Sequence, residues 1–188
     1  MRLTLAGSDA CYSVRQESAR QFGKSEFSRN MPKDKDAAAK KAIVSELKRA
    51  YAAELETVQN YLANSIDLDG VRAEEIKKAL SADIQEELGH AMMLAKRIKV
   101  LGGRVPGSME LERNQKFLQP PSDSTDLITV IKGVIAAEDS AIAQYEKIIR
   151  LCDQIDFVTQ DLVVTLLGDE QEHRRAFVGY LTEFEKRK

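Results

Sequence analysis

Four long segments of the sequence carry apolar residues at steps of three and four, and this period constrains the fold more than any other feature. The segments cover residues 35–66, 70–101, 123–152 and 155–187. Side chains spaced in this way fall on one face of an α-helix, so each segment predicts a helix with one buried face. Four such helices in a chain of 188 residues predict an all-α fold, a four-helix bundle.

The connections between the segments predict how the helices pack. Only Asp69-Gly70 separates the first two segments, and the third and fourth are also joined by a few residues. Short connections make consecutive helices antiparallel neighbours. By contrast, residues 104–123 join the second segment to the third, which predicts a long crossover between helices 2 and 3.

The first part of the chain differs from the rest in composition. Residues 1–36 are polar, mixed in charge and without a clear period, so they predict an N-terminal arm. The bundle domain is expected to cover residues 37–188. A chain of this length has room for one domain with its own hydrophobic core.

Charge and cysteine content exclude several classes of protein. The 28 Lys and Arg residues nearly balance the 30 Asp and Glu residues, which gives no reason to expect nucleic acid or a membrane surface as a partner. The two cysteines, Cys11 and Cys152, are too few and too far apart for a disulfide framework or a CxxC site. No apolar stretch approaches a membrane span and the N-terminus lacks a secretory signal, so we expect a cytoplasmic protein.

Each predicted helix places a glutamate where its apolar stripe predicts a hydrophobic residue. In the second helix Glu87 occupies such a position between Ile84 and Ala91. The corresponding glutamates of the other helices are Glu54, Glu138 and Glu170. A buried, unpaired carboxylate costs several kcal/mol, so four that converge on one core would destabilise the bundle unless cations neutralise them. The pattern therefore predicts a metal centre.

The two histidines of the chain strengthen this prediction. His90 follows Glu87 by three residues, and His173 follows Glu170 by three. This spacing places a glutamate and a histidine one helical turn apart on nearly the same face, where both can bind one ion. The separation from Glu87 to Glu170 equals that from His90 to His173, which indicates a helical hairpin used twice. Two hairpins with carboxylate and imidazole ligands predict a site for two ions, of which iron or manganese fits best and zinc is an alternative.

The six residues together resemble the di-iron site of the ferritin-like superfamily, in particular that of bacterioferritin. The resemblance covers residues 40–187 and is clearest in the stretches ELETVQNY, EELGHAMMLAKRIKVLGG, AAEDSAIAQYEKIIRLCD and GDEQEHRRAF. It implies a ferritin-like four-helix bundle that binds two Fe ions. By the same resemblance, Glu54 and Glu138 are the terminal carboxylates and Glu87 and Glu170 are the bridging carboxylates. His90 and His173 each give one imidazole ligand to one iron.

Several neighbours of these ligands have two possible roles. Tyr61, seven residues after Glu54, matches a tyrosine that borders the metal site in the resembled proteins, so it is a candidate for a catalytic role. A core tyrosine with its hydroxyl tied to a neighbour is the alternative, and this alternative is favoured for Tyr145. Five acidic residues near the ligands predict a solvated face: Glu56, Glu86, Asp139, Asp169 and Glu172. One of Glu86, Asp139 and Asp169 can instead orient a ligand histidine.

Three departures from the resembled proteins narrow the expectation. Leu88 occupies the position of the methionine that binds haem in bacterioferritin, so no haem is predicted. Ala141 replaces a glutamate found in rubrerythrin-like peroxidases, and the chain has no CxxC motif. The residues after His173 suffice to finish the fourth helix but not to add the short fifth helix of cage-forming relatives. We therefore expect a homo-oligomer, with a dimer favoured over a 24-subunit cage.

The resemblance implies a ferroxidase-type oxidoreductase, which binds Fe(II) and oxidises it with O₂ or H₂O₂ in iron handling or in protection from oxidative stress. Two alternatives remain open. One is a non-catalytic component that binds or stores iron. The other is a di-metal oxidase or catalase that acts on another substrate, because one fold serves many chemistries. A substrate channel beside the site would favour this last alternative.

Overall fold

The computed structural model describes residues 33–186, and the chain from Asp36 onward forms one compact unit. Its four long helices are α2 (Lys33–Asp67), α3 (Ala73–Val100), α4 (Leu127–Cys152) and α5 (Phe157–Lys186). Two short 3₁₀ helices, η3 (Ser108–Glu110) and η4 (Lys116–Leu118), lie in the connection between α3 and α4. The described residues contain no strand, and the predicted all-α, four-helix fold is confirmed. The predicted arm lies largely outside the described residues, so its boundary stays a prediction.

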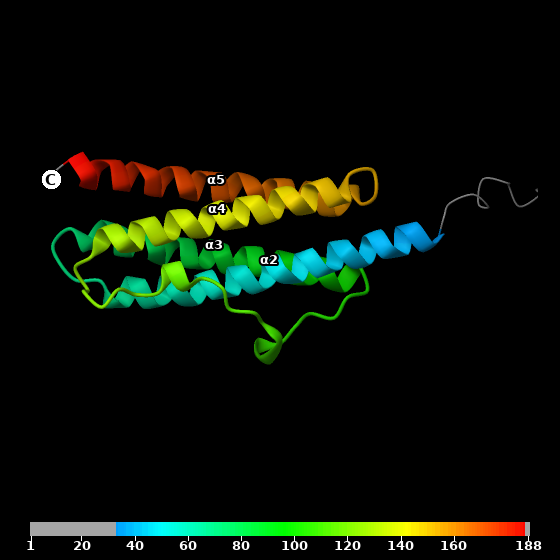
Figure 1. The fold of residues 1–188 in the computed structure, drawn as a ribbon, viewed down its shortest axis with the longest axis horizontal. Helices are drawn as coiled ribbons and strands as arrows, with labels where there is room; N and C mark the ends of the chain where they lie inside the picture. The colour runs from blue at the N-terminus through cyan, green and yellow to red at the C-terminus, as the bar shows by residue number, and fades with distance from the viewer. Residues whose placement is uncertain (1–32, 187–188) are drawn as a thin grey trace, which may run out of the picture. The chain divides into compact units, whose positions relative to one another are not determined.

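The helices lie side by side along one axis (Figure 1). α2 and α3 are antiparallel, as are α4 and α5, while the crossover runs back along α2 and lets α4 start at the opposite end from the one where α3 finishes (Figure 1). Hydrogen bonds tie α2 to α4 and α3 to α5. Gln144 Nε2 donates to Glu46 O at 3.1 Å, and Arg97 Nε donates to Thr159 Oγ1 at 2.6 Å. The bundle therefore has an α2–α4 side and an α3–α5 side.

Local side-chain chemistry sets where the helices begin. α4 begins at Leu127 rather than near residue 123, because Asp126 caps it by accepting a hydrogen bond from Thr129 N at 3.0 Å. Asp156 caps α5 in the same way, through Thr159 N at 3.0 Å. Before α3 the chain turns at Gly70, whose φ of 109° favours glycine, so this helix begins three residues later than predicted.

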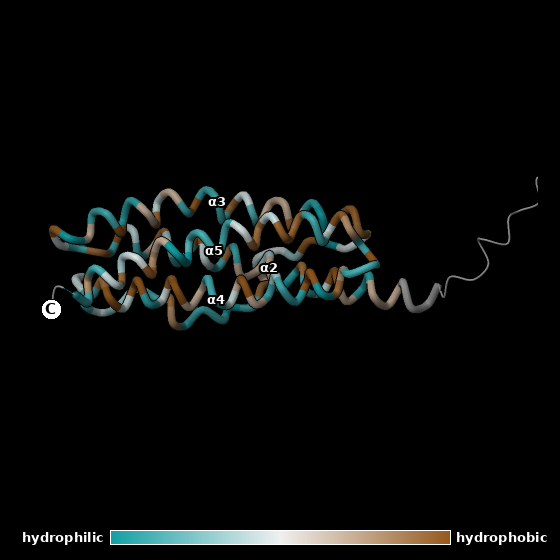
Figure 2. The backbone as a smooth tube through the Cα atoms, turned by 90° about the horizontal axis from the view of Figure 1, so that it is seen from above, coloured by the Kyte–Doolittle hydropathy of each residue, from teal (hydrophilic) through white to brown (hydrophobic). Residues whose placement is uncertain are grey.

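The hydrophobic core consists of two clusters. One cluster packs at the end of the bundle where α2 finishes, and it includes Leu68, Ile76, Leu80, Ile131, Val134 and Phe177. The other packs at the end where α3 finishes, and it includes Ile43, Leu47, Leu94, Ile98, Ile148, Cys152, Val163 and Leu166. Figure 2 shows how hydrophobic and hydrophilic residues alternate along every helix. In each helix the predicted metal ligands fall between the residues of the two clusters, so a polar layer divides the core.

The crossover is fixed to α2 by buried polar contacts. The carboxylate of Glu56 accepts hydrogen bonds from Asn114 N at 2.8 Å and from Gln115 N at 3.0 Å. Gln115 Nε2 donates to Thr57 Oγ1 at 2.7 Å. The prediction that Glu56 lies on a solvated face is wrong, since only 6% of its surface is exposed. Its position is set by the backbone that packs over it, which the helical period does not report.

None of the described helices is both long enough and apolar enough to cross a membrane.

Candidate metal centre

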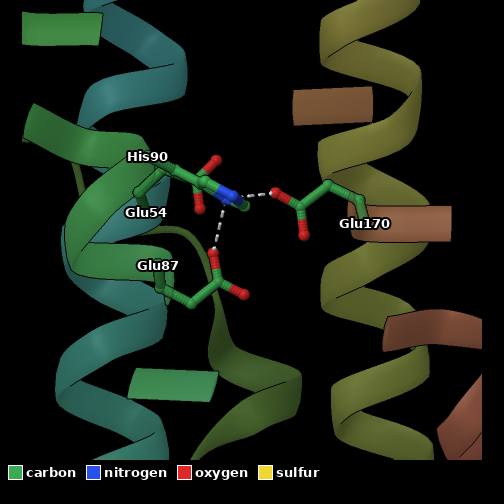
Figure 3. Close-up of side chains that lie close together, drawn as sticks. All are labelled: Glu54, Glu87, His90 and Glu170. Carbon is green, nitrogen blue, oxygen red and sulfur yellow. Dashed lines mark ion pairs between the residues drawn. The ribbon is translucent and has the colours of Figure 1, made fainter. Parts of the chain in front are cut away.

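The polar layer brings the six predicted ligands together. The side chains form two sets, and within each set one nitrogen or oxygen atom per residue lies within 4.8 Å of the corresponding atoms of the others. The first set is Glu54, Glu87, His90 and Glu170, and the second is Glu87, Glu138, Glu170 and His173. Figure 3 shows the first set, with His90 facing both Glu87 and Glu170. Each set offers three carboxylates and one imidazole, and two glutamates belong to both sets.

The two shared glutamates each direct one oxygen to each histidine. Glu87 places Oε2 3.4 Å from His90 Nδ1 and Oε1 3.4 Å from His173 Nδ1. Glu170 places Oε1 2.9 Å from His90 Nδ1 and Oε2 3.4 Å from His173 Nδ1. The two imidazole rings face each other across the centre, with their centroids 6.3 Å apart. This geometry is that of carboxylates able to bridge two ions.

The inner atoms of the centre have no protein partner of regular hydrogen-bond geometry within the described part of the chain. These atoms are both carboxylate oxygens of Glu87 and of Glu170, and Nδ1 of His90 and of His173. All four glutamates are buried, and Glu170 has no exposed surface. Buried polar atoms without partners are costly, so a cluster of six is expected where an ion supplies the partner. The mixture of oxygen and nitrogen donors fits iron, manganese or zinc.

Without metal, protons are the charges that balance this centre. Burial alone would lower the pKa of both imidazoles, but their contacts with Glu170 and Glu87 raise it to about 10 for His90 and about 12 for His173. Although burial acts to raise the pKa of Glu87, the two histidines lower it to about 2. Two imidazolium ions therefore face two carboxylates. Metal ions must displace these protons to bind.

The two terminal glutamates behave in the opposite way. Burial raises the pKa of Glu54 and of Glu138 well above its usual value, and the neighbouring charges of Glu87 and Glu170 raise it further. The centre therefore holds more carboxylates than its own histidines can neutralise. Cations would remove this excess of negative charge.

Each histidine also contacts a carboxylate through its outer nitrogen. His90 Nε2 lies 3.3 Å from Asp169 Oδ2, and His173 Nε2 lies 2.7 Å from Glu86 Oε2. Each carboxylate comes from the helix opposite its histidine, and such contacts fix the orientation of a ligand ring. Of the three acids considered for this role, two are therefore placed to take it. The third, Asp139, instead accepts a hydrogen bond from Arg174 Nε at 2.5 Å.

A pair of tyrosines completes the surroundings of the ligands. Tyr61 donates its hydroxyl hydrogen bond to Glu138, and Tyr145 donates one to Glu54. Both tyrosines are fully buried. Burial is the main cause that raises the pKa of each phenol well above its usual value, and the negative charge of the adjacent glutamates raises it further. Tyr145 is thus the counterpart of Tyr61. The signal was present in the sequence, because each tyrosine follows a ligand glutamate by seven residues.

A family model of the ferritin-like domain matches residues 44–187 of the chain. Bacterioferritin of Desulfovibrio desulfuricans is 27% identical over 135 residues, which cover 71% of each protein. A bacterial ferritin of Neisseria meningitidis serogroup B is 27% identical over 132 residues, or 70% of this chain and 80% of the relative. The DNA protection during starvation protein of Pyrococcus furiosus is 28% identical over 138 residues, or 71% of this chain and 74% of the relative.

Solved structures agree on the fold. The X-ray structure of the D. desulfuricans bacterioferritin, which has a di-iron site, superposes with a TM-score of 0.69 at 22% identity, over 80% of this chain and 84% of that one. A dodecameric thioferritin, the bacterioferritin-related protein of Bacteroides fragilis, gives a TM-score of 0.70 at 22% identity, over 78% and 88% of the two chains. At this identity the likeness establishes the bundle alone. Because the family model spans most of the chain, this protein belongs to the ferritin-like family of di-iron carboxylate proteins, close to the bacterioferritins.

Proposed function

We propose that the protein is a ferroxidase-type oxidoreductase, which binds two Fe(II) ions as substrate and oxidises them with O₂ or H₂O₂. Family membership and the carboxylate and histidine cluster support a role in iron handling. The observation that carries the finer proposal is the pair of shared glutamates, each with one oxygen directed to each histidine. Two ions held side by side in this way can together deliver the two electrons that O₂ needs to become H₂O₂.

Each residue has a defined part in this proposal. Glu54 and His90 would hold one ion, and Glu138 and His173 would hold the other, while Glu87 and Glu170 would bridge the two. Burial of these side chains keeps bulk water from the ions. No haem is part of this proposal, since Leu88 has no group that binds iron.

Charge balance explains how the residues can favour oxidation. Four carboxylates balance two Fe(II) ions, and the loss of two electrons leaves an excess of two positive charges. Asp169 and Glu86 lie against the outer nitrogens of the histidines, where their negative charges offset this excess. Tyr145 donates a hydrogen bond to Glu54 and Tyr61 donates one to Glu138, so each phenol would orient a terminal carboxylate. The protein groups therefore stabilise the oxidised pair more than the reduced pair.

Stopped-flow absorbance tests the proposal. The protein is loaded anaerobically with two Fe(II) per chain and mixed with O₂ or H₂O₂, and Fe(III) absorbance should rise within the first turnover. Glu87→Ala should abolish binding of two metal ions, whereas Glu74→Ala, an exposed site on the same helix, should bind as the parent does. Unchanged metal stoichiometry in Glu87→Ala would show that the proposed site is wrong. If two ions bind but no absorbance appears on addition of oxidant, the result would indicate a protein that binds or stores iron without oxidising it.

We also propose that the protein assembles as a homo-oligomer, with a dimer as the expected form. One structural neighbour is a dodecamer, so a larger assembly is the direct competitor. Sedimentation equilibrium separates them, since a dimer has twice the mass of the 21.0 kDa chain. A mass near twelve or twenty-four chains would contradict the dimer.

A further inference from the structure

A cavity of about 480 Å³ lies on the α2–α4 side of the bundle, away from the α3–α5 side that carries both histidines. Its walls are α2, α4 and the crossover. Figure 1 shows the crossover standing away from α2 around η3 and returning to the bundle at η4. The contacts of Glu56 with Asn114 N and Gln115 N fix the returning part, so the cavity is built into the fold.

Five alanines give the cavity apolar patches on two of its walls. Ala50, Ala52 and Ala53 come from α2, and Ala137 and Ala141 come from α4. The polar side chains among them already have partners: Gln115 donates to Thr57, and Gln144 donates to Glu46. Ser140, an exposed residue, donates to Ala136 O, and its hydroxyl oxygen can also accept a hydrogen bond. A ligand with an apolar body and one hydroxyl group would match these alanines and Ser140.

The rim of the cavity does not select for charge. Lys48 and Arg49 from α2 face Glu110 and Glu112 from the crossover. Arg49 pairs with Glu46 at 3.4 Å, and Glu110 pairs with Arg104. Since two residues of each sign line this rim, neither an anion nor a cation gains a clear advantage. The occupant with the best match is uncharged.

The inner end of the cavity meets the metal centre. Glu54 and Tyr145, joined by the hydrogen bond from the phenol to the carboxylate, form part of its lining. The volume falls within the range of about 300–1,000 Å³ that small-molecule sites occupy. It also exceeds by far the roughly 30 Å³ that one water takes in the liquid, so O₂ or H₂O₂ alone would leave it mostly unfilled.

We propose that this cavity binds a small, uncharged organic molecule of the phenol class, with its ring between the alanines of α2 and α4 and its hydroxyl on Ser140. The molecule would lie beside the Glu54–Tyr145 pair. This site goes beyond the proposed oxidation of iron and does not depend on it. It gives the centre an organic ligand that a ferroxidase does not need.

Fluorescence titration with 2-naphthol, a neutral aromatic alcohol, tests the proposal. The chain has no tryptophan, so the probe can be excited where the protein does not absorb. With the zinc-loaded full chain we expect saturable binding of one probe per chain and a blue-shifted emission from the shielded ring. Ala53→Leu and Ala141→Leu, which fill the cavity from opposite walls, should weaken binding at least tenfold. Ala143→Leu, an exposed site on α4 outside the cavity, should bind the probe as the parent does.

Binding that does not saturate, or equal affinity in the parent and both filled variants, would overturn the proposal. Two filled variants are used so that one remains if the other fails to fold. Tighter binding of 2-naphthoate than of 2-naphthol would overturn the assignment to an uncharged ligand. In cobalt-loaded protein 2-naphthol should alter the visible absorption of the metal, and an unchanged spectrum would contradict a position beside Glu54. Zinc stoichiometry, measured in each variant, separates loss of this site from loss of the metal centre.

Discussion

His90 and His173 are the residues at which protons and metal ions compete most directly. In the metal-free centre their contacts with Glu170 and Glu87 outweigh burial and raise the pKa to about 10 and about 12. Both rings therefore carry a proton on the nitrogen that faces the centre at neutral pH. Glu54 and Glu138, whose pKa is raised by burial and by neighbouring charge, hold protons more tightly than exposed glutamates do.

This competition predicts that the apparent affinity for metal rises with pH. Each ion must displace the proton of one imidazole, so affinity should increase from about pH 6 to about pH 9, and at least two protons should leave per pair of ions. Competition between the protein and a chelator of known affinity for Co(II) measures the first effect. An indicator dye in weak buffer measures the second. An affinity independent of pH after correction for the chelator would contradict the protonated histidines.

The two tyrosines test the symmetry of the centre. Tyr145→Phe removes the hydroxyl that donates to Glu54, and Tyr61→Phe removes the one that donates to Glu138. A hydrogen bond to a charged group contributes about 1.5–3 kcal/mol. Each variant should therefore lower the affinity for one of the two metal ions by roughly tenfold or more. Stepwise Co(II) titration should show this loss for one site in each variant. Tyr180→Phe, which lies against Phe177 away from the ligands, is the matched control. If Tyr145→Phe titrated like Tyr180→Phe, the phenol would not position Glu54.

At the residue scale, the sequence identified candidate ligands where a polar side chain interrupts the helical spacing of apolar residues. The six candidate ligands could be named because each glutamate or histidine falls on or beside an apolar stripe. The same period could not show that Asp169 contacts His90, or that Glu86 contacts His173, because those contacts join different helices. The prediction that Tyr145 is a core tyrosine with its hydroxyl tied to a neighbour is confirmed, but the identity of that neighbour was not predictable. Glu54 lies on another helix, and its contact with Tyr145 forms only when the bundle is assembled.

At the scale of the helices, the approach of the crossover to α4 depends on one glycine. A Cβ atom added at Gly133 would lie 2.6 Å from Phe117 O and 3.3 Å from Leu118 Cα. These are backbone atoms of the crossover, which cannot move away as a flexible side chain can. η4 therefore packs on α4 at a distance that only glycine allows.

Gly133→Ala should consequently destabilise the protein, although alanine is the better helix former. The clash should cost about 1–3 kcal/mol and exceed the gain in helix propensity of at most about 1 kcal/mol. Gly179→Ala on α5 is the matched control, because no neighbouring atom lies within 4 Å of its added Cβ, and it should stabilise the protein slightly. Urea unfolding measures both free energies. Changes of the same sign in the two variants would contradict the close approach.

The existence and approximate extent of each helix were predictable from the apolar period, but the exact residue at which each helix begins was not. α4 begins at Leu127 and α3 at Ala73 because a cap at Asp126 and a turn at Gly70 act locally, where apolar spacing carries no information. The pairing of Arg97 with Asp156 also joins the end of α3 to the start of α5, with a distance of 2.6 Å. Such contacts arise from helix packing, so they follow from the assembled fold rather than from the pattern of one segment.

At the scale of the whole bundle, the polar layer divides the hydrophobic core into two clusters, and the charge state of that layer couples the centre to stability. With protons in place of metal the two clusters can still form, so the metal-free protein should remain helical. The histidine contribution to its stability is fully present below about pH 6.5 and is lost as the pH rises through the folded-state pKa of about 10 for His90. The raised pKa of Glu54 and Glu138 acts in the same direction, because their ionisation at higher pH adds uncompensated buried charge.

Removal of metal should therefore lower the melting temperature, and the loss should grow with pH. At a free metal concentration one hundred times its dissociation constant, each bound ion adds about 2.7 kcal/mol to the folded state. Thermal unfolding followed by circular dichroism, with zinc or with a chelator at about pH 6.5 and about pH 9, measures the difference. We expect a larger difference at the higher pH, because the stability that the protonated histidines give the metal-free protein declines above about pH 6.5. Glu74→Ala should show the parent's difference at both values, whereas Glu87→Ala should show almost none. A difference that shrinks as the pH rises would contradict the exchange of protons for metal at this centre.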